Sequence, residues 1–188
     1  MKTIVITGYK PMELGIFKND DPKINIIKSA VKKKLINLID EGLQWVIISG
    51  QMGVELWTGE VIIELKEEDY DISLGILPPF SNQQSRWPEA MQLAYEQLIE
   101  QCDFYKEIYE KNYEGPHQFR ARDQFFIEHS DGCVVLFDEE TPGSPKYLID
   151  LIKKFQEHHD YVLLFITPSD LEETAEEIRM MNPDYWSQ

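Results

Sequence analysis

The sequence predicts an α/β protein with a Rossmann-like, doubly wound and mainly parallel sheet that carries helices on both faces. Short apolar runs alternate with longer segments whose apolar residues recur at helical spacing, and this alternation is typical of a parallel sheet. Residues 133–137 form a continuous apolar run, as expected for a strand buried on both faces. With 188 residues, of which 43% are hydrophobic, the chain is predicted to form a single domain over residues 1–188.

The junction after residues 45–49 has the pattern of a ligand-binding turn. An apolar run ends at Gly50 and helical spacing begins three residues later, so a buried strand is expected to turn tightly into a helix. Gly50 and Gly53, with Gln51 between them, would let a phosphate approach the free N–H groups of the helix start. Glu55 lies on the first helical turn, where the dipole favours its ionised form and hydrogen bonds from ribose hydroxyls. Alternatively, the glycines serve only the turn and Glu55 only balances the dipole.

The first strand, residues 3–7, leads into a loop where a doubly wound sheet first approaches its ligand, and Gly8 and Tyr9 stand at that point. The loop continues to about Asp21, and loops of this length in compact domains are often functional. A helix should begin after Asp21 and end at Gly42. Its apolar stripe consists of Ile24, Ile27, Val31, Leu35 and Leu38.

The helix after Gly53 is followed by a third strand and a polar loop. That helix has core spacing at Val54, Trp57, Val61, Ile62 and Leu65, so Trp57 is expected in the core. The strand is expected over residues 71–77 and is stopped by two prolines. In the loop, Phe80 or Trp87 could stack on a base and Arg86 could meet a phosphate, or the loop only connects to a helix near Pro88.

Two arginines are conspicuous in the acidic second half of the chain. After a helix around residues 93–98 and a short strand within 104–109, residues 116–129 have the pattern of another helix. Arg120 and Arg122 lie on it, and guanidinium groups match the geometry of phosphate. The alternative is that both arginines form ion pairs with nearby acidic side chains.

The strand of residues 133–137 ends in a turn-rich loop, residues 138–145, that feeds another helix. Gly143 and Ser144 stand at this helix start and repeat the pattern of the earlier junction, so they too are candidates to bind a ligand. The helix carries Leu148, Leu151, Ile152 and Phe155 on one face.

The chain closes with a last strand over residues 161–167 and a helix from Pro168, whose apolar stripe is Leu171, Ala175, Ile178 and Met181. Tyr185 and Trp186 follow this helix, and we expect them to dock on the domain or on a second subunit. The oligomeric state stays open, and a homo-oligomer is one of the alternatives.

The charge distribution disfavours nucleic acid as a partner. The formal net charge is −16. Residues 1–40 have a net charge of +4, so the rest of the chain has a net charge of −20. An acidic body of this size repels the backbones of DNA and RNA. Lys28, Lys32, Lys33 and Lys34 form the local exception, and the favoured interpretation is a solvated helix face.

Other classes of site and location find little support in the sequence. Cys102 and Cys133 are far apart, so we expect reduced thiols and neither a disulfide framework nor a cysteine metal site. The four histidines do not have the spacing of a metal motif. Because no apolar run is long enough for a membrane span and no signal peptide precedes the first strand, we expect a cytoplasmic protein without a membrane segment.

Four runs of residues carry a resemblance to a known family over nearly the whole chain. With these runs in place, the sequence resembles the YpsA family, bacterial proteins grouped with the SLOG superfamily that also holds the DNA-processing protein DprA and the LOG phosphoribohydrolases. The runs are Thr-Gly-Tyr at 7–9, Ser-Gly-Gln-Met-Gly-Val-Glu at 49–55, Leu-Gly-Ile-Leu-Pro-Pro-Phe at 74–80, and Phe-Arg-Ala-Arg-Asp-Gln at 119–124 before Ser130 and Asp131.

The resemblance implies a Rossmann-like sheet that binds nucleotides or nucleotide-derived ligands. Our leading hypothesis is a sensor or regulator that binds an ADP-ribose or NAD-like molecule at the loops of Gly8, Gly50 and Gly143 and passes its occupancy to a partner. YpsA-like proteins have been tied to cell-division control in Gram-positive bacteria, so the resemblance implies a protein partner in that process.

Two alternatives come from the wider superfamily. LOG-type enzymes use a Pro-Gly-Gly-x-Gly-Thr-x-x-Glu run, whereas residues 142–150 lack two of those glycines and the threonine and offer Asp150 as the carboxylate. The first alternative is therefore a hydrolase of nucleotide N-glycosidic bonds that uses Glu55 or Asp150, which leaves open whether the protein is an enzyme. The second is a DprA-like DNA-binding module that uses the lysines from Lys28 to Lys34.

Overall fold

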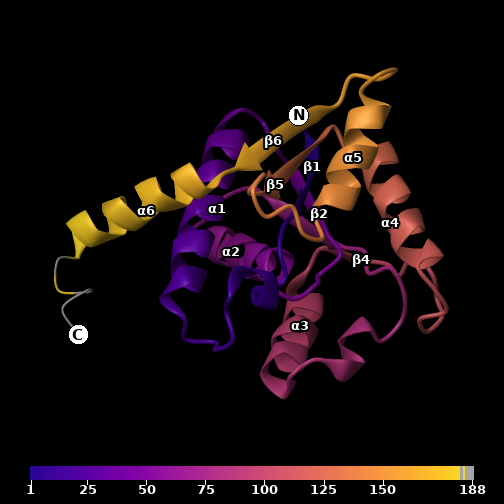
Figure 1. The fold of residues 1–188 in the computed structure, drawn as a ribbon, viewed down its shortest axis with the longest axis horizontal. Coiled ribbons are helices and arrows are strands. Elements are labelled where there is room, and N and C mark those ends of the chain that lie inside the picture. Colours follow the sequence, from indigo (N-terminus) through magenta and orange to yellow (C-terminus); the bar gives the residue numbers. More distant parts are fainter. Residues whose placement is uncertain (183, 185–188) are drawn as a thin grey trace.

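The protein forms one six-stranded sheet with helices packed on it (Figure 1). The structure, a computed structural model, describes residues 1–182 and 184. The docking expected for Tyr185 and Trp186 lies outside these described residues.

The sheet is parallel at every pair of neighbouring strands, and the strand order is β4-β3-β2-β1-β5-β6. This confirms the predicted α/β class and its Rossmann-like arrangement. The strands are β1 (Thr3–Thr7), β2 (Trp45–Ile48), β3 (Ser73–Ile76), β4 (Phe104–Tyr105), β5 (Gly132–Leu136) and β6 (Val162–Ile166).

Helices cover both faces of the sheet (Figure 1). Alternate residues of β1 join different core layers. Ile4 and Ile6 of β1 join the core under α1, α2 and α3, whereas Val5 joins the core under α4 and α5. Trp57 is 5% exposed in the first of these cores, as predicted. Of the helices in the described part of the chain, none is long and apolar enough to cross a membrane. The helices are α1 (Pro22–Asp40), α2 (Val54–Glu67), α3 (Glu89–Gln101), α4 (His117–Glu128), α5 (Lys146–Phe155) and α6 (Pro168–Met181).

Side-chain caps place the starts of α1 and α6. The carboxylate of Asp21 accepts a hydrogen bond from Lys23 N at 2.9 Å, and Pro22 occupies the first turn, where its missing N–H costs nothing. Thr167 and Asp170 cap α6 reciprocally, because each side chain binds the backbone N–H of the other residue.

The strand order reverses beside β1. The chain runs outward from β1 through β2 and β3 to β4, and then α4 carries it back across the sheet to β5, on the other side of β1. The loops that leave β1 and β5 therefore diverge at the carboxyl edge of the sheet. In parallel α/β sheets, the crevice at such a switch point is where ligands bind.

Two strands are shorter than the sequence suggested, and two prolines end the pairing between them. The third strand was expected over 71–77 and covers Ser73–Ile76, and the fourth covers only Phe104–Tyr105 of 104–109. Ile108 N and Tyr109 N still bond to the carbonyls of Pro78 and Pro79, at 2.9 and 3.3 Å. The two prolines have no N–H to return these bonds, so the ladder ends there.

The lysine cluster of α1 joins helices to one another. Lys28 bonds to Glu64 at 2.8 Å and Lys32 to Glu68 at 2.6 Å, both on α2. Lys33 bonds to Glu177 of α6 at 2.7 Å. These three lysines remain at least partly exposed, in agreement with the expected solvated face, and their charges are also paired with acidic residues of neighbouring helices.

The loop after β1 lies directly against the start of α2. Val54 N donates a hydrogen bond to Tyr9 O at 3.1 Å. A Cβ atom on Gly53 would lie 2.3 Å from Tyr9 O, and one on Gly8 would lie 2.8 Å from the side chain of Val54. Both glycines are therefore needed for the contact between this loop and α2.

We expect Gly53→Ala to lower the free energy of unfolding by about 2–4 kcal/mol, because it combines a positive φ with a clash against backbone atoms. Gly42→Ala is the matched control, since Gly42 also has a positive φ but a Cβ there would meet nothing within 4 Å. This control should cost only about 1 kcal/mol. Urea denaturation of both variants provides the measurement, and equal losses would show that the contact with Tyr9 does not constrain the fold.

Candidate functional site

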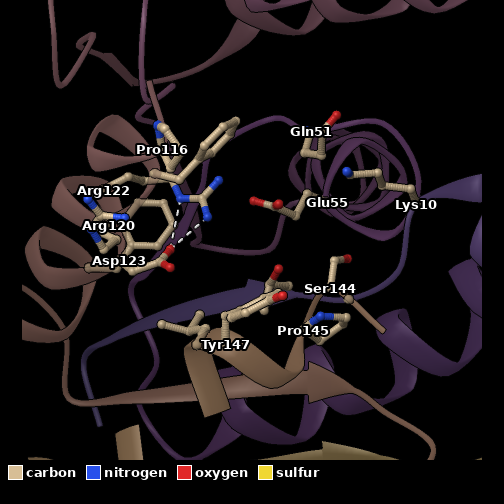
Figure 2. A pocket seen from close by; sticks show the side chains of 15 residues that line it. Lys10, Gln51, Glu55, Pro116, Arg120, Arg122, Asp123, Ser144, Pro145 and Tyr147 are labelled. Atoms are coloured by element: carbon tan, nitrogen blue, oxygen red, sulfur yellow. Dashed lines mark hydrogen bonds and ion pairs between the residues drawn. The ribbon is translucent and has the colours of Figure 1, made fainter. Parts of the chain in front are cut away.

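A cavity of about 450 Å³ opens at the carboxyl edge of the sheet, beside the switch point (Figure 2). Its volume is within the usual range for small-ligand sites. The loop after β1, the first turn of α2, one face of α4 and the start of α5 surround it. Its lining residues are Thr7, Gly8, Lys10, Gln51, Glu55, Pro116, Phe119, Arg120, Arg122, Asp123, Phe126, Ser144, Pro145, Tyr147 and Leu148.

One face of α4 forms a wall of this cavity. Phe119, Arg122, Asp123 and Phe126 follow one another at three- and four-residue spacing, so their side chains share one face of the helix. Asp123 and Phe126 are buried, at 8% and 2% exposure. The wall therefore combines two aromatic rings with a cation and an anion.

Arg122 is held in place but keeps donors for a ligand. Its Nε and Nη2 donate to Oδ1 of Asp123 at 2.9 and 2.7 Å. Its guanidinium carbon lies 5.4 Å from the centroid of the Phe119 ring and 5.8 Å from that of Phe126. A guanidinium has five N–H donors, and Figure 2 shows this one directed into the cavity toward Glu55. Arg122 thus forms the ion pair that was its alternative role and still presents N–H groups to the cavity.

Arg120, the second arginine singled out in the sequence, has a different environment. It lines the cavity but is exposed to solvent, and it precedes Arg122 by two residues, which points it away from the face of Phe119 and Asp123. The two arginines are therefore not equivalent as candidates to hold a phosphate.

Glu55 is buried at the inner end of the cavity, with 5% of its surface exposed. Ser49 N donates to Glu55 Oε1 at 2.6 Å, and Ser49 Oγ donates to the same oxygen at 2.9 Å. Burial raises the pKa of Glu55, and the charge of Arg122 and the Ser49 donors only partly oppose it. Burial thus acts against the ionised form of Glu55 that the helix dipole was expected to favour.

Gln83 supports this arrangement from behind. Its Nε2 donates to Ser49 O at 2.7 Å and to the Tyr95 hydroxyl at 3.1 Å. Burial raises the pKa of Tyr95 to about 12, so its hydroxyl keeps its proton at neutral pH. Gln83 is itself buried, at 9% exposure. The polar network that orients Glu55 thus extends from β2 to α3.

Three charged groups meet in the cavity: the carboxylates of Glu55 and Asp123, with the Arg122 guanidinium directed between them (Figure 2). Burial also raises the pKa of Asp123, against the effect of Arg122. Burying two acids beside one arginine is costly to folding, and perturbed groups gathered in a cleft are typical of functional sites. Together they can accept hydrogen bonds from hydroxyls, donate to an anion, and hold or release a proton.

The start of α5 already carries an anion from the chain itself. Ser144 N and Ser144 Oγ donate to the Glu13 carboxylate, each at 2.8 Å, and Lys10 N donates to Glu13 Oε2 at 2.8 Å. Burial opposes ionisation of Glu13, but these donors outweigh it and lower its pKa. Of the two residues predicted here to bind a ligand, Ser144 lines the cavity while its donors bond to Glu13, and Gly143 is not a lining residue.

Tyr9 lies underneath the cavity, with 3% of its surface exposed, and is not among the lining residues. Its hydroxyl donates to Thr141 O at 2.6 Å and accepts from Asp138 N at 2.8 Å. Its ring stacks on Phe137, with the centroids 6.4 Å apart. In this structure Tyr9 therefore connects the loops that follow β1 and β5.

The other residues predicted around the first junction divide between the cavity and the fold. Gly8 and Gln51 line the cavity, and Gln51 Oε1 also accepts a hydrogen bond from Met52 N at 2.9 Å. Gly50 and Gly53 are not lining residues. A Cβ atom on Gly50 would lie 2.6 Å from the Tyr95 ring, so this glycine, like Gly53, is required by packing.

The aromatic residues of the cavity differ from those expected to stack on a base. Phe80 packs on Tyr113 and Phe119, with centroids 5.1 and 5.5 Å apart, and supports Phe119 from outside. Trp87 packs on Tyr95, and neither Phe80 nor Trp87 is a lining residue, nor is Arg86. The rings available to a ligand are Phe119, Phe126 and Tyr147, and Tyr147 is 79% exposed at the rim.

Four functional candidates were not identified from the sequence: Lys10, Glu13, Asp123 and Tyr147. Asp123 could have been found, because it completes the face of Phe119 and Arg122 at helical spacing. Lys10 and Glu13 lie in a loop without periodicity, and only the structure places them beside Ser144.

Comparisons with known proteins agree with the resemblance. A model of the YpsA family, described as "YspA SLOG family", matches residues 4–171. A UPF0398 protein of Oceanobacillus iheyensis is 51% identical over 186 residues, which covers 99% of this chain and 100% of that relative. A UPF0398 protein of Bacillus cereus is 47% identical over 184 residues, and one of Bacillus thuringiensis is 46% identical over 184 residues. Each of these two matches covers 98% of this chain and 100% of the relative.

The pH dependence of stability should reveal the buried Glu55. Because the folded state raises its pKa, the folded protein holds the proton more tightly than the unfolded chain does. Stability therefore falls as pH rises from the ordinary range of a glutamate up to the folded pKa, and is level above it. Across that window, we expect the free energy of unfolding of Glu55→Gln to rise by about 1–3 kcal/mol relative to wild type. This is the usual scale for a buried polar group that is poorly compensated.

Glu13→Gln is the control with the opposite sign. The pKa of Glu13 is lowered in the folded state. Its ionised carboxylate therefore stabilises the fold above the ordinary range of a glutamate, and this stabilisation is lost as pH falls through the folded pKa. Urea denaturation at a series of pH values measures both variants. A Glu55→Gln curve parallel to that of wild type would show that Glu55 is not held at a raised pKa.

Proposed function

The chain belongs to the YpsA family of SLOG proteins, and from that premise we propose that it binds a nucleotide-derived small molecule in the cavity at the switch point. The ligand class that we propose is ADP-ribose or an NAD-like molecule. The observation that carries the proposal is the Arg122 guanidinium, which is fixed between two aromatic rings and directs free donors into the cavity beside Glu55.

The chemistry of the lining suits the three parts of a nucleotide. A guanidinium with unused N–H groups matches a phosphate, and Lys10 adds a second cation whose side chain points into the cavity in Figure 2. The oxygens of Glu55 and Asp123 are acceptors for ribose hydroxyls. Phe119 and the exposed ring of Tyr147 offer flat apolar surfaces to a base.

We further propose that ligand occupancy is passed to a partner protein, so that the protein acts as a sensor or regulator. The cavity touches four separate segments, and a ligand that bridges them would bias their relative positions. A role in bacterial cell division is the part of this proposal that rests on the family resemblance alone.

A second candidate function, hydrolysis of a nucleotide N-glycosidic bond, is favoured by one observation. Burial raises the pKa of Glu55, which prepares a carboxyl group to donate a proton to a leaving base. Asp150, the other carboxylate considered from the sequence, does not line the cavity and pairs with Lys146 on the exposed side of α5. Glu55 is therefore the carboxylate on which this alternative depends.

The third hypothesis, a DprA-like DNA-binding module, has less support. Three of the four lysines on which it rests are paired with glutamates of α2 and α6. A phosphate backbone would have to compete with these carboxylates for Lys28, Lys32 and Lys33. The overall charge of −16 adds to the repulsion.

Arg122→Lys should weaken binding of ADP-ribose or NAD about 10- to 100-fold, because one ammonium cannot bond to Asp123 and to a phosphate as a guanidinium can. Arg120→Lys is the matched control on the same helix and should change the affinity much less, since Arg120 is exposed at the rim. Isothermal titration calorimetry of both variants with both ligands provides the comparison. Unchanged affinity in Arg122→Lys would remove the phosphate-binding role of this residue.

Glu55→Gln distinguishes the binding protein from the hydrolase. On the main proposal, wild type releases no free base from NAD, ADP-ribose or nucleoside monophosphates, and the variant loses only affinity, by about 10- to 100-fold for a lost charged acceptor. Chromatography of overnight incubations detects any free base. Base released by wild type and not by Glu55→Gln would overturn the binding-only function in favour of the hydrolase.

A further inference from the structure

We propose that Glu13 is a specificity-determining residue: its carboxylate takes the anion position at the start of α5 and excludes a ligand phosphate from that end of the cavity. The phosphate of the ligand is then directed to Arg122, and the Ser144 side receives an uncharged, hydroxyl-bearing part of the molecule. This inference rests on the proposed function, because it names which end of the same cavity recognises which group.

The contacts of Glu13 resemble those that a bound phosphate oxygen pair would make. Oε1 accepts a hydrogen bond from Ser144 N at 2.8 Å. Oε2 accepts from Ser144 Oγ and from Lys10 N, each at 2.8 Å. Both oxygens are thus used, and the backbone and side-chain donors of Ser144 are committed to the carboxylate.

The glycine at this helix start makes room for Glu13. Gly143 has a φ of +50°, and a Cβ atom there would lie 2.8 Å from Glu13 Oε1. The absence of a side chain at this position is therefore explained by the carboxylate of the chain. The donors also lower the pKa of Glu13 despite its partial burial, so the group is an anion at neutral pH.

A second anion at this position would meet a fixed negative charge. Like charges in contact in a partly buried site are strongly unfavourable, and Ser144 N and Ser144 Oγ already donate to Glu13. On the opposite wall, Arg122 uses two donors for Asp123 and keeps the others free. The available positive charge of the cavity therefore lies on Arg122 of α4 and on Lys10, whereas the Ser144 donors before α5 are held by a carboxylate of the chain.

The test measures how inorganic phosphate changes the melting temperature in four proteins: wild type, Glu13→Ala, Arg122→Gln and the double variant. Potassium chloride at the same ionic strength is the reference for each protein, so general salt effects cancel. Glu139→Ala, a change of an exposed carboxylate in the neighbouring loop, is the matched control. Glu13→Gln, which keeps the shape of the side chain, replaces Glu13→Ala if that variant does not fold.

We expect phosphate in tenfold excess over its dissociation constant to raise the melting temperature of Glu13→Ala and of the double variant by about 2–4 °C. In Arg122→Gln, where Glu13 is intact, the melting temperature in phosphate should equal that in potassium chloride. Two results would overturn the inference: a gain in Arg122→Gln, which means that phosphate displaces Glu13, or a double variant that gains no more than Arg122→Gln. Because the probe is inorganic phosphate, a failure of nucleotide binding in the calorimetric titrations would not produce either result.

Discussion

The contact between the loop after β1 and the start of α2 is the constraint on which the site depends. The carbonyl of Tyr9 lies so close to residue 53 that only glycine fits there, and Val54 N bonds to that carbonyl at 3.1 Å. The same short segment reaches the other side of the switch point, where the Tyr9 hydroxyl bonds to the loop after β5 and Glu13 bonds to Ser144. One loop thus holds the starts of α2 and α5 at a fixed separation, and the cavity is the space left between them and α4.

The electrostatics of the cavity follow from burial more than from formal charge. Glu55 and Glu13 are both glutamates near a helix start, yet their pKa values are displaced in opposite directions. Glu55 is buried, so desolvation raises its pKa against the Ser49 donors and the charge of Arg122, whereas Glu13 is only partly buried, so its donors outweigh desolvation and lower its pKa. The first arrangement favours the protonated form of a carboxyl group that lines the cavity, and the second favours a negative charge at Glu13.

The sequence predicted the fold well because its signals are local. Apolar runs without alternation marked the central strands, and Asp21-Pro22 and Gly42 marked the ends of α1. The candidate site was predicted only in part, because its chemistry depends on long-range contacts. Arg122 was identified from its residue type, but its fixed position depends on rings and on Asp123, and Glu13 meets Ser144 across 131 residues. Gly50 and Gly53 looked like ligand loops because a tight backbone contact and a phosphate contact require the same residue.

In doubly wound folds, the free N–H groups at helix starts are the usual partners of phosphate. Here two N–H groups in the turns before these helices are bonded within the chain, because Gln51 Oε1 accepts from Met52 N before α2 and Glu13 accepts from Ser144 N before α5. The positive charge that remains for a ligand comes from the side chains of Arg122 and Lys10. Backbone donors persist when residues change, whereas side-chain donors can be altered one at a time. Side chains on α4 and on the first loop can therefore change while the sheet and its switch point stay the same.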